Sequence, residues 1–167
     1  DSALALLPAD RRNAVRPTLE RGVMIPPERL EEIPRLGLTV TLMPGHLPDE
    51  QRWLENRLGT RRMKGVEEWR TLADAQARLA FGTDAPAGPS DPVMLFYCAV
   101  TRQNAAGRPG GGWYGEQKLT RAEALAALTS GAAMAGRRPE GAGTLERGRP
   151  ADLTVLSRDI MTVPDPE

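Results

Sequence analysis

The segment Leu38-Thr-Val-Thr-Leu-Met43 constrains the fold of this chain more than any other. Its β-branched, almost continuously apolar pattern is typical of a strand buried on both faces, as strands are in parallel sheets. Parallel strands are joined by crossover connections, which are usually helices. The segment therefore predicts an α/β fold in which strands and helices alternate.

The rest of the chain shows that alternation. Helix patterns cover 28–36, 67–78, 91–101 and 120–135, with the end of a helix at 2–7; strand patterns cover 15–20, 79–81 and 153–156. Thr120 and Glu123 have the spacing of a capping box, and Gly37 fits a helix C-terminus. A polar connection over 44–64 and a Gly-rich loop over 104–115 complete the pattern. This order predicts parallel βα units with right-handed crossovers.

Charge and composition exclude several classes of function. Lys and Arg number 22, as do Asp and Glu, so the net charge is zero and a general nucleic-acid or membrane-surface binder is disfavoured. The sequence contains no run of 18 apolar residues, so no transmembrane helix is predicted. The single cysteine, Cys98, cannot form an internal disulfide and is predicted to be a buried thiol. A single unpaired cysteine is consistent with a reducing compartment, and we expect the protein to be cytoplasmic.

Asp84 is the main candidate for chemistry. It follows the strand pattern at 79–81 directly, between Gly82 and Pro86. A carboxylate at the carboxyl end of a strand is typical of a catalytic group at the mouth of an α/β barrel. The alternative is a turn in which Asp84 caps the next segment. The chain has one histidine, His46, so few other catalytic arrangements are open to it.

Five motifs resemble those of the metal-dependent amidohydrolases, in the branch called amidohydrolase family 3 or YtcJ-like. They resemble, in order, strands 6, 7 and 8 of that family, the helix before its small β-sandwich, and its sandwich signature. The motifs are Arg16-Pro-Thr-Leu-Glu-Arg-Gly22, Thr39-Val-Thr-Leu-Met-Pro-Gly-His46, Leu79-Ala-Phe-Gly-Thr-Asp-Ala-Pro86, Leu119-Thr-Arg-Ala-Glu-Ala-Leu125 and Gly143-Thr-Leu-Glu-Arg-Gly-Arg-Pro-Ala-Asp-Leu-Thr-Val-Leu156.

The resemblance implies the C-terminal portion of a (β/α)8 TIM barrel, about strands 6–8 with their helices. It divides the chain into a partial barrel domain at 1–138 and a β-sandwich segment at 139–167. A complete barrel of this kind needs ~250 residues, more than the 167 present. We therefore expect the chain to be part of a longer protein. Unpaired edges at 15–20 and 79–83 predict self-association, or pairing with a missing N-terminal part.

The resemblance also implies chemistry for particular residues. Asp84 matches the aspartate that, in this family, binds a divalent metal, with one or two zinc ions expected, and acts as general base toward metal-activated water. His46 matches a position where this branch often has a histidine near the substrate, although it could equally be a surface residue. Trp113 follows three glycines in a loop that could line a pocket at the barrel mouth and so lie near the substrate, although packing is the commoner role of such a residue. Arg21 stands where the family usually has histidine. A guanidinium has no lone pair to give a metal, so one metal ligand of the family is missing here. Three interpretations stay open: the protein is an inactive relative, it holds a single metal through other ligands, or Arg21 clamps an anionic substrate group.

Two functions follow as expectations. The first is a metal-dependent hydrolase that cleaves carbon–nitrogen bonds in small amides, N-formyl groups or cyclic imides, with Asp84 as base. The second is a truncated or decayed, catalytically inactive piece that serves as a structural or interaction module. The substitution at Arg21 and the incomplete ligand set motivate the second. We expect the parent protein to be an enzyme and the isolated chain to be inactive.

Overall fold

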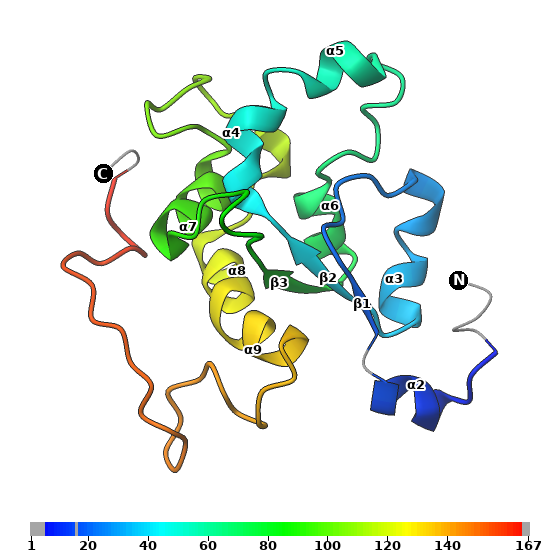
Figure 1. The fold of residues 1–167 in the computed structure, drawn as a ribbon, viewed down its shortest axis with the longest axis vertical. Helices are drawn as coiled ribbons and strands as arrows, with labels where there is room; N and C mark the ends of the chain where they lie inside the picture. The colour runs from blue at the N-terminus through cyan, green and yellow to red at the C-terminus, as the bar shows by residue number, and fades with distance from the viewer. Residues whose placement is uncertain (1–5, 16, 165–167) are drawn as a thin grey trace.

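The computed structural model describes residues 6–15 and 17–164, and its centre is a parallel sheet of three strands (Figure 1). The strand order is β1 (Thr18–Leu19), β2 (Thr39–Leu42) and β3 (Arg78–Phe81). Thr18 pairs with Thr39, and Leu42 pairs with Phe81. The α/β class and the parallel sheet predicted from the sequence are confirmed.

Strand β2 is the buried centre of the sheet, as its apolar pattern predicted. All four of its residues are buried, and Val40 and Leu42 belong to the main core with Trp69 and Leu72. Within the described part of the chain, β1 and β3 each pair with β2 alone. The sheet therefore has two edges without a neighbouring strand among those residues.

A continuous helical run covers β3. It consists of α8 (Arg121–Ala126), the π-helical segment η4 (Ala127–Gly131) and α9 (Ala132–Ala135), which confirms the predicted helix (Figure 1). The predicted capping box also forms, because Thr120 and Glu123 satisfy each other's main-chain N–H groups. At Gly131 a β-carbon would lie 2.2 Å from the Leu79 carbonyl oxygen. Glycine thus permits the close approach of this run to the strand.

Short helical elements fill the remaining connections. The long helix is α7 (Pro92–Thr101), which begins at an Asp91 cap, as expected for the 91–101 pattern. The other elements are α2 (Ala9–Val15), η1 (Pro27–Arg29), α3 (Glu32–Arg35), η2 (Pro44–His46), α4 (Leu47–Glu50), α5 (Leu54–Leu58), α6 (Trp69–Asp74) and η3 (Gly115–Gln117).

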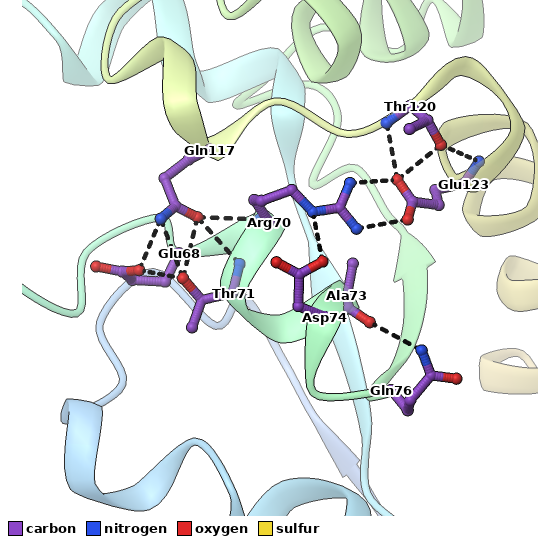
Figure 2. Close-up of polar contacts among 9 residues, drawn as sticks. All are labelled: Glu68, Arg70, Thr71, Ala73, Asp74, Gln76, Gln117, Thr120 and Glu123. Atoms are coloured by element: carbon purple, nitrogen blue, oxygen red, sulfur yellow. Dashed lines mark hydrogen bonds and ion pairs between the residues drawn. The ribbon is translucent and has the colours of Figure 1, made fainter.

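A polar network joins α6 to the start of α8, as Figure 2 shows. Arg70 contacts both carboxylate oxygens of Glu123, at 2.6 and 2.5 Å, and also pairs with Asp74 at 2.9 Å. Gln117 accepts hydrogen bonds from the main-chain N–H groups of Arg70 and Thr71. Residues about 50 positions apart are therefore fixed to one another beside the sheet.

Several predicted boundaries are wrong. Val15 ends helix α2, so the first strand shrinks to β1. The pattern at 28–36 is split into η1 and α3, and the polar connection at 44–64 contains η2, α4 and α5. Helix α6 stops at Asp74 because Gln76 adopts a positive φ of 61°, and Arg78 already belongs to β3. The helix end predicted at 2–7 falls mostly outside the described residues.

The strand predicted at 153–156 is absent from the structure. These residues carry no strand hydrogen bonding, and Val155 is 93% exposed. A strand needs a partner for its main-chain groups, and none of the described residues pairs with this one. The segment after α9 instead runs around the outside of the helices to the C-terminus (orange to red in Figure 1). None of the helices in 6–15 and 17–164 has both the length and the hydropathy that a membrane span requires.

Candidate site at the carboxyl edge of the sheet

Three polar side chains meet where the parallel strands end. Arg21 follows β1, His46 lies in η2 after β2, and Asp84 follows β3. Because the strands are parallel and in register, their carboxyl ends share one edge of the sheet. That edge is where open α/β sheets place their ligands.

Asp84 is held from two directions. Its Oδ1 lies 2.7 Å from His46 Nε2, and its Oδ2 lies 3.6 Å from Arg21 Nη1. An ionised carboxylate can only accept, so His46 donates in this hydrogen bond. The second contact is an attraction between charges at a separation too long for a hydrogen bond. Asp84 is thus oriented by His46 and neutralised by Arg21.

The surrounding backbone is built closely around this pair. At Gly88 a β-carbon would lie 2.7 Å from both Asp84 Oδ1 and His46 Nε2. Any larger residue there would displace one of the two side chains. The Asp84 side chain nevertheless remains 33% exposed, and that of His46 15%. The Asp84 carboxylate can therefore be reached from solvent.

The local charges favour the ionised form of Asp84. The hydrogen bond from His46 is the largest cause that holds the pKa of Asp84 below its ordinary value. The positive charge of Arg21 acts in the same direction, and partial desolvation opposes both. Asp84 is consequently a carboxylate at neutral pH, able to accept a proton.

Arg21 is itself held by hydrogen bonds to residues of α4 and β2. Its Nη2 donates to Glu50 Oε1 at 3.2 Å, and its main-chain N–H donates to Thr41 Oγ1 at 3.0 Å. The same Thr41 hydroxyl donates to Glu20 at 2.7 Å. Arg21 adopts a positive φ of 50°, a conformation that few residues other than glycine occupy. Arg21 therefore pairs with Glu50 and Asp84, while the neighbouring Glu20 accepts from Thr41.

A buried cluster that the sequence did not single out lies next to Glu50. Glu50 and Glu67 are 4% and 5% exposed, and Arg102 is fully buried. The Arg102 guanidinium stacks over Trp69 at 4.4 Å from the ring centre. Glu50 falls in the polar connection at 44–64, and Glu67 is the first residue of the helix pattern at 67–78, so no periodicity marked either of them as an interior residue.

Trp113 lies apart from the other candidate residues in its contacts. Its ring packs edge-on against Tyr114 at 5.0 Å and lies 5.7 Å from the Arg102 guanidinium. Its carbonyl oxygen accepts from Arg102 Nε at 2.6 Å. The structure thus brings Asp84, His46 and Arg21 together, whereas Trp113 belongs to the packing around Arg102. Its role near a substrate stays a prediction.

The donors at this edge do not by themselves fit a metal ion. Among the described residues, no three His, Cys, Asp or Glu side chains are grouped so that they could hold one. Asp84 offers the one carboxylate that faces His46, and the neighbouring position is filled by a guanidinium, which is cationic and has no lone pair. This part of the chain supplies at most a partial ligand set.

A parallel sheet with a charged cluster at its carboxyl edge is an arrangement typical of α/β enzymes. The amidohydrolase family model matches residues 2–167. The chain therefore belongs to the amidohydrolase family, as its motifs predicted.

Relatives of this chain include enzymes and solved structures. It is 31% identical over 136 residues to the putative amidohydrolase YtcJ of Bacillus subtilis, covering 81% of this chain and 26% of that protein. It is 34% identical over 90 residues to N-substituted formamide deformylase of Arthrobacter pascens, covering 54% and 16%. An uncharacterized metal-dependent hydrolase from Pyrococcus horikoshii superimposes with a TM-score of 0.78 at 27% identity, covering 96% and 32%. The chain thus spans a third or less of the length of each of these relatives.

Proposed function

We propose that this chain contributes a proton-accepting carboxylate, Asp84, to a metal-dependent hydrolase of carbon–nitrogen bonds in small amides, N-formyl compounds or cyclic imides. The observation that carries the proposal is the contact of Asp84 with His46 at 2.7 Å on the carboxyl edge of the sheet. Membership of the amidohydrolase family and similarity to a formamide deformylase and a metal-dependent hydrolase support the class of reaction.

Asp84 and its neighbours have distinct parts in this proposal. Asp84, ionised at neutral pH, accepts a proton from the attacking water and returns it to the nitrogen that leaves. His46 fixes the direction of the carboxylate. Arg21 balances its charge and also faces solvent, with its side chain 42% exposed. Arg21 could therefore contact an anionic group of a substrate.

A divalent metal is the cofactor that the family supports, and zinc is the candidate. Such an ion supplies Lewis-acid activation of water. Because the described residues do not complete a ligand set, the remaining ligands would have to come from a part of the protein outside this chain. In that arrangement, residues 1–138 form the last three strands of a barrel and 139–167 form a segment of the accompanying sandwich. The two strand edges and the shares of the relatives that are covered support this arrangement.

A non-catalytic role is the second candidate, and Arg21 favours it. A guanidinium 3.6 Å from Asp84 neutralises the carboxylate without any metal. In such a protein this fold would serve as a structural or interaction module and would not catalyse a reaction.

An activity assay distinguishes the hydrolase from the non-catalytic role. The assay uses the protein translated from the complete reading frame that contains these residues. We expect hydrolysis of an N-formyl amine, an amide or a cyclic imide in the presence of Zn²⁺, Mn²⁺ or Co²⁺. Asp84→Asn should lower kcat/KM by about 10²–10⁴-fold, the usual contribution of a general base. Asp49→Asn is the matched control, because the Asp49 side chain is 79% exposed on α4. A metal-free protein without turnover would establish the second role instead.

A further inference from the structure

Two buried carboxyl groups lie one behind the other next to Arg21. Glu50 ends α4, and its Oε1 accepts from Arg21 Nη2 at 3.2 Å. Its other oxygen, Oε2, is buried and has no hydrogen-bond partner among the described residues. Glu67 stands just before α6 and accepts from the indole Nε1–H of Trp69. Both side chains are buried, and Glu50 acts on the Glu67 carboxyl both by its charge and as a hydrogen-bonding neighbour that raises its pKa.

Two ionised carboxylates could not share such a contact favourably. Both would be acceptors, they would repel each other, and Glu50 Oε2 would stay unpaired in the interior. A proton on Glu67 removes all three costs, since the resulting O–H donates to Glu50. Burial is the largest cause that raises the pKa of Glu67 well above its ordinary value, and the charge of Glu50 raises it further.

Arg102 is the main opposing charge, and its hydrogen bonds go elsewhere. Its Nε donates to the Trp113 carbonyl oxygen at 2.6 Å, and its Nη1 donates to the main-chain oxygen of Glu67 at 3.1 Å. Its Nη2 is buried and has no partner among the described residues. Arg102 thus lowers the pKa of Glu67 by its charge but does not bind the Glu67 carboxyl. Glu68 and Glu116, the other acidic groups near Arg102, act on Arg102 itself.

We propose that Glu50 and Glu67 form a carboxylate–carboxylic acid pair that positions Arg21. In this pair the O–H group of Glu67 donates a hydrogen bond to Glu50, and the Glu50 carboxylate holds the Arg21 guanidinium. The closer contact of Arg21 is with Glu50, at 3.2 Å, and the longer one is with Asp84, at 3.6 Å. Glu50 therefore keeps Arg21 near Asp84 without letting it close on the carboxylate. The Asp84 side chain, 33% exposed, thus stays accessible for the proton transfer proposed above.

The role given to Asp84 rests on the proposed function, so the test uses no turnover. The first measurement is carbon-13 NMR of the side-chain carboxyl groups in the unmodified chain. We expect the Glu67 carboxyl to be protonated at pH 7. An ionised Glu67 at pH 7 would overturn the proposal, and this measurement depends on no variant.

The second measurement is the solvent exchange of the Arg21 guanidinium protons, followed by nitrogen-15 NMR at one pH. Glu50→Gln removes the charge that holds Arg21, and Glu67→Met removes the donor to Glu50 with little change in length. Both should speed exchange by at least about tenfold, the factor for losing one hydrogen bond to a charged group. Glu67→Gln still donates to Glu50 and accepts from Trp69, so exchange should stay within about twofold of the unmodified chain.

Glu31→Gln is the control, because Glu31 is exposed and has no side-chain cap hydrogen bond. Equal exchange in Glu50→Gln and this control would overturn the proposal. So would equal exchange in Glu67→Gln and Glu67→Met, because the donated proton would then have no part in holding Arg21. A protein without hydrolytic activity that passes both measurements would retain the pair and lose the function proposed for Asp84.

Discussion

Glu123 offers the sharpest quantitative prediction about stability. Its carboxylate receives both terminal nitrogens of Arg70 and the main-chain N–H of Thr120 (Figure 2). Replacement by Gln keeps an acceptor for the capping box but removes the charge that Arg70 recognises. The variant therefore isolates the ionic part of the contact between α6 and α8.

The magnitude follows from the shift in ionisation. Hydrogen bonds from Arg70 are the main cause that lowers the pKa of Glu123 from 4.5 to about 2. A shift of this size corresponds to about 3 kcal/mol at neutral pH if fully expressed. Because the side chain is 34% exposed, solvent screening reduces this, and we expect a loss of about 1–2 kcal/mol in Glu123→Gln.

The pH dependence fixes the sign. The folded-state pKa is lower than the unfolded one, so the stabilisation is complete above about pH 5 and is lost as the pH falls toward 2. Urea denaturation of the two proteins should therefore show a difference at pH 7 that shrinks by more than half at pH 3. The corresponding loss in Tm at pH 7 is about 2–8 °C for a chain of this size.

Two results would refute this reasoning. One is a variant within about 0.5 kcal/mol of the unmodified chain at pH 7, the range of ordinary surface changes. The other is a difference that does not depend on pH between 7 and 3. Glu146→Gln is the matched control, since its pair with Arg149 is exposed (65% for Glu146) and should contribute little at any pH.

Three further predictions test the fold. Burial raises the pKa of Cys98 to about 11, so its reaction with a disulfide reagent at pH 8 should be at least about 100-fold slower in the native chain than in urea; equal rates would contradict its burial. Gly131→Ala should destabilise the chain by about 1–3 kcal/mol in urea denaturation, whereas Gly82→Ala, where a β-carbon meets nothing within 4 Å, should cost less; equal losses would refute the close approach to β3. The edges of β1 and β3 should make the isolated chain associate with rising concentration, and light scattering that shows a monomer throughout would contradict this.

The sequence predicted those features that depend on local residue patterns. The apolar pattern of β2 predicted a strand buried on both faces, and the Thr120–Glu123 spacing predicted the start of α8. The position of Asp84 after β3 followed from the same pattern, because the end of a parallel strand dictates which edge the next residue occupies. Propensity failed where pairing decides, as at 153–156, whose main-chain groups find no strand in the described part of the chain.

The contacts of the site could not be predicted, because they join residues far apart in sequence. Arg21 was recognised as unusual from its residue type, but its partner Glu50 lies 29 positions away in a stretch that reads as polar connection. Glu67 and Arg102 were missed for the same reason, since a buried charge is recognisable only once its surroundings are known. His46 had two open interpretations, and its contact with Asp84, 38 positions away, was visible only in three dimensions.

Nitrogen-15 NMR of the His46 ring tests most directly whether Asp84 and His46 meet at the rim of the sheet. Since the chain has one histidine, its two ring signals are free of overlap from any other. Asp84→Asn should move the Nε2 signal clearly at pH 7, whereas Asp49→Asn should leave both ring signals in place. Ring signals that are the same in Asp84→Asn as in the unmodified chain would contradict the contact and, with it, the site.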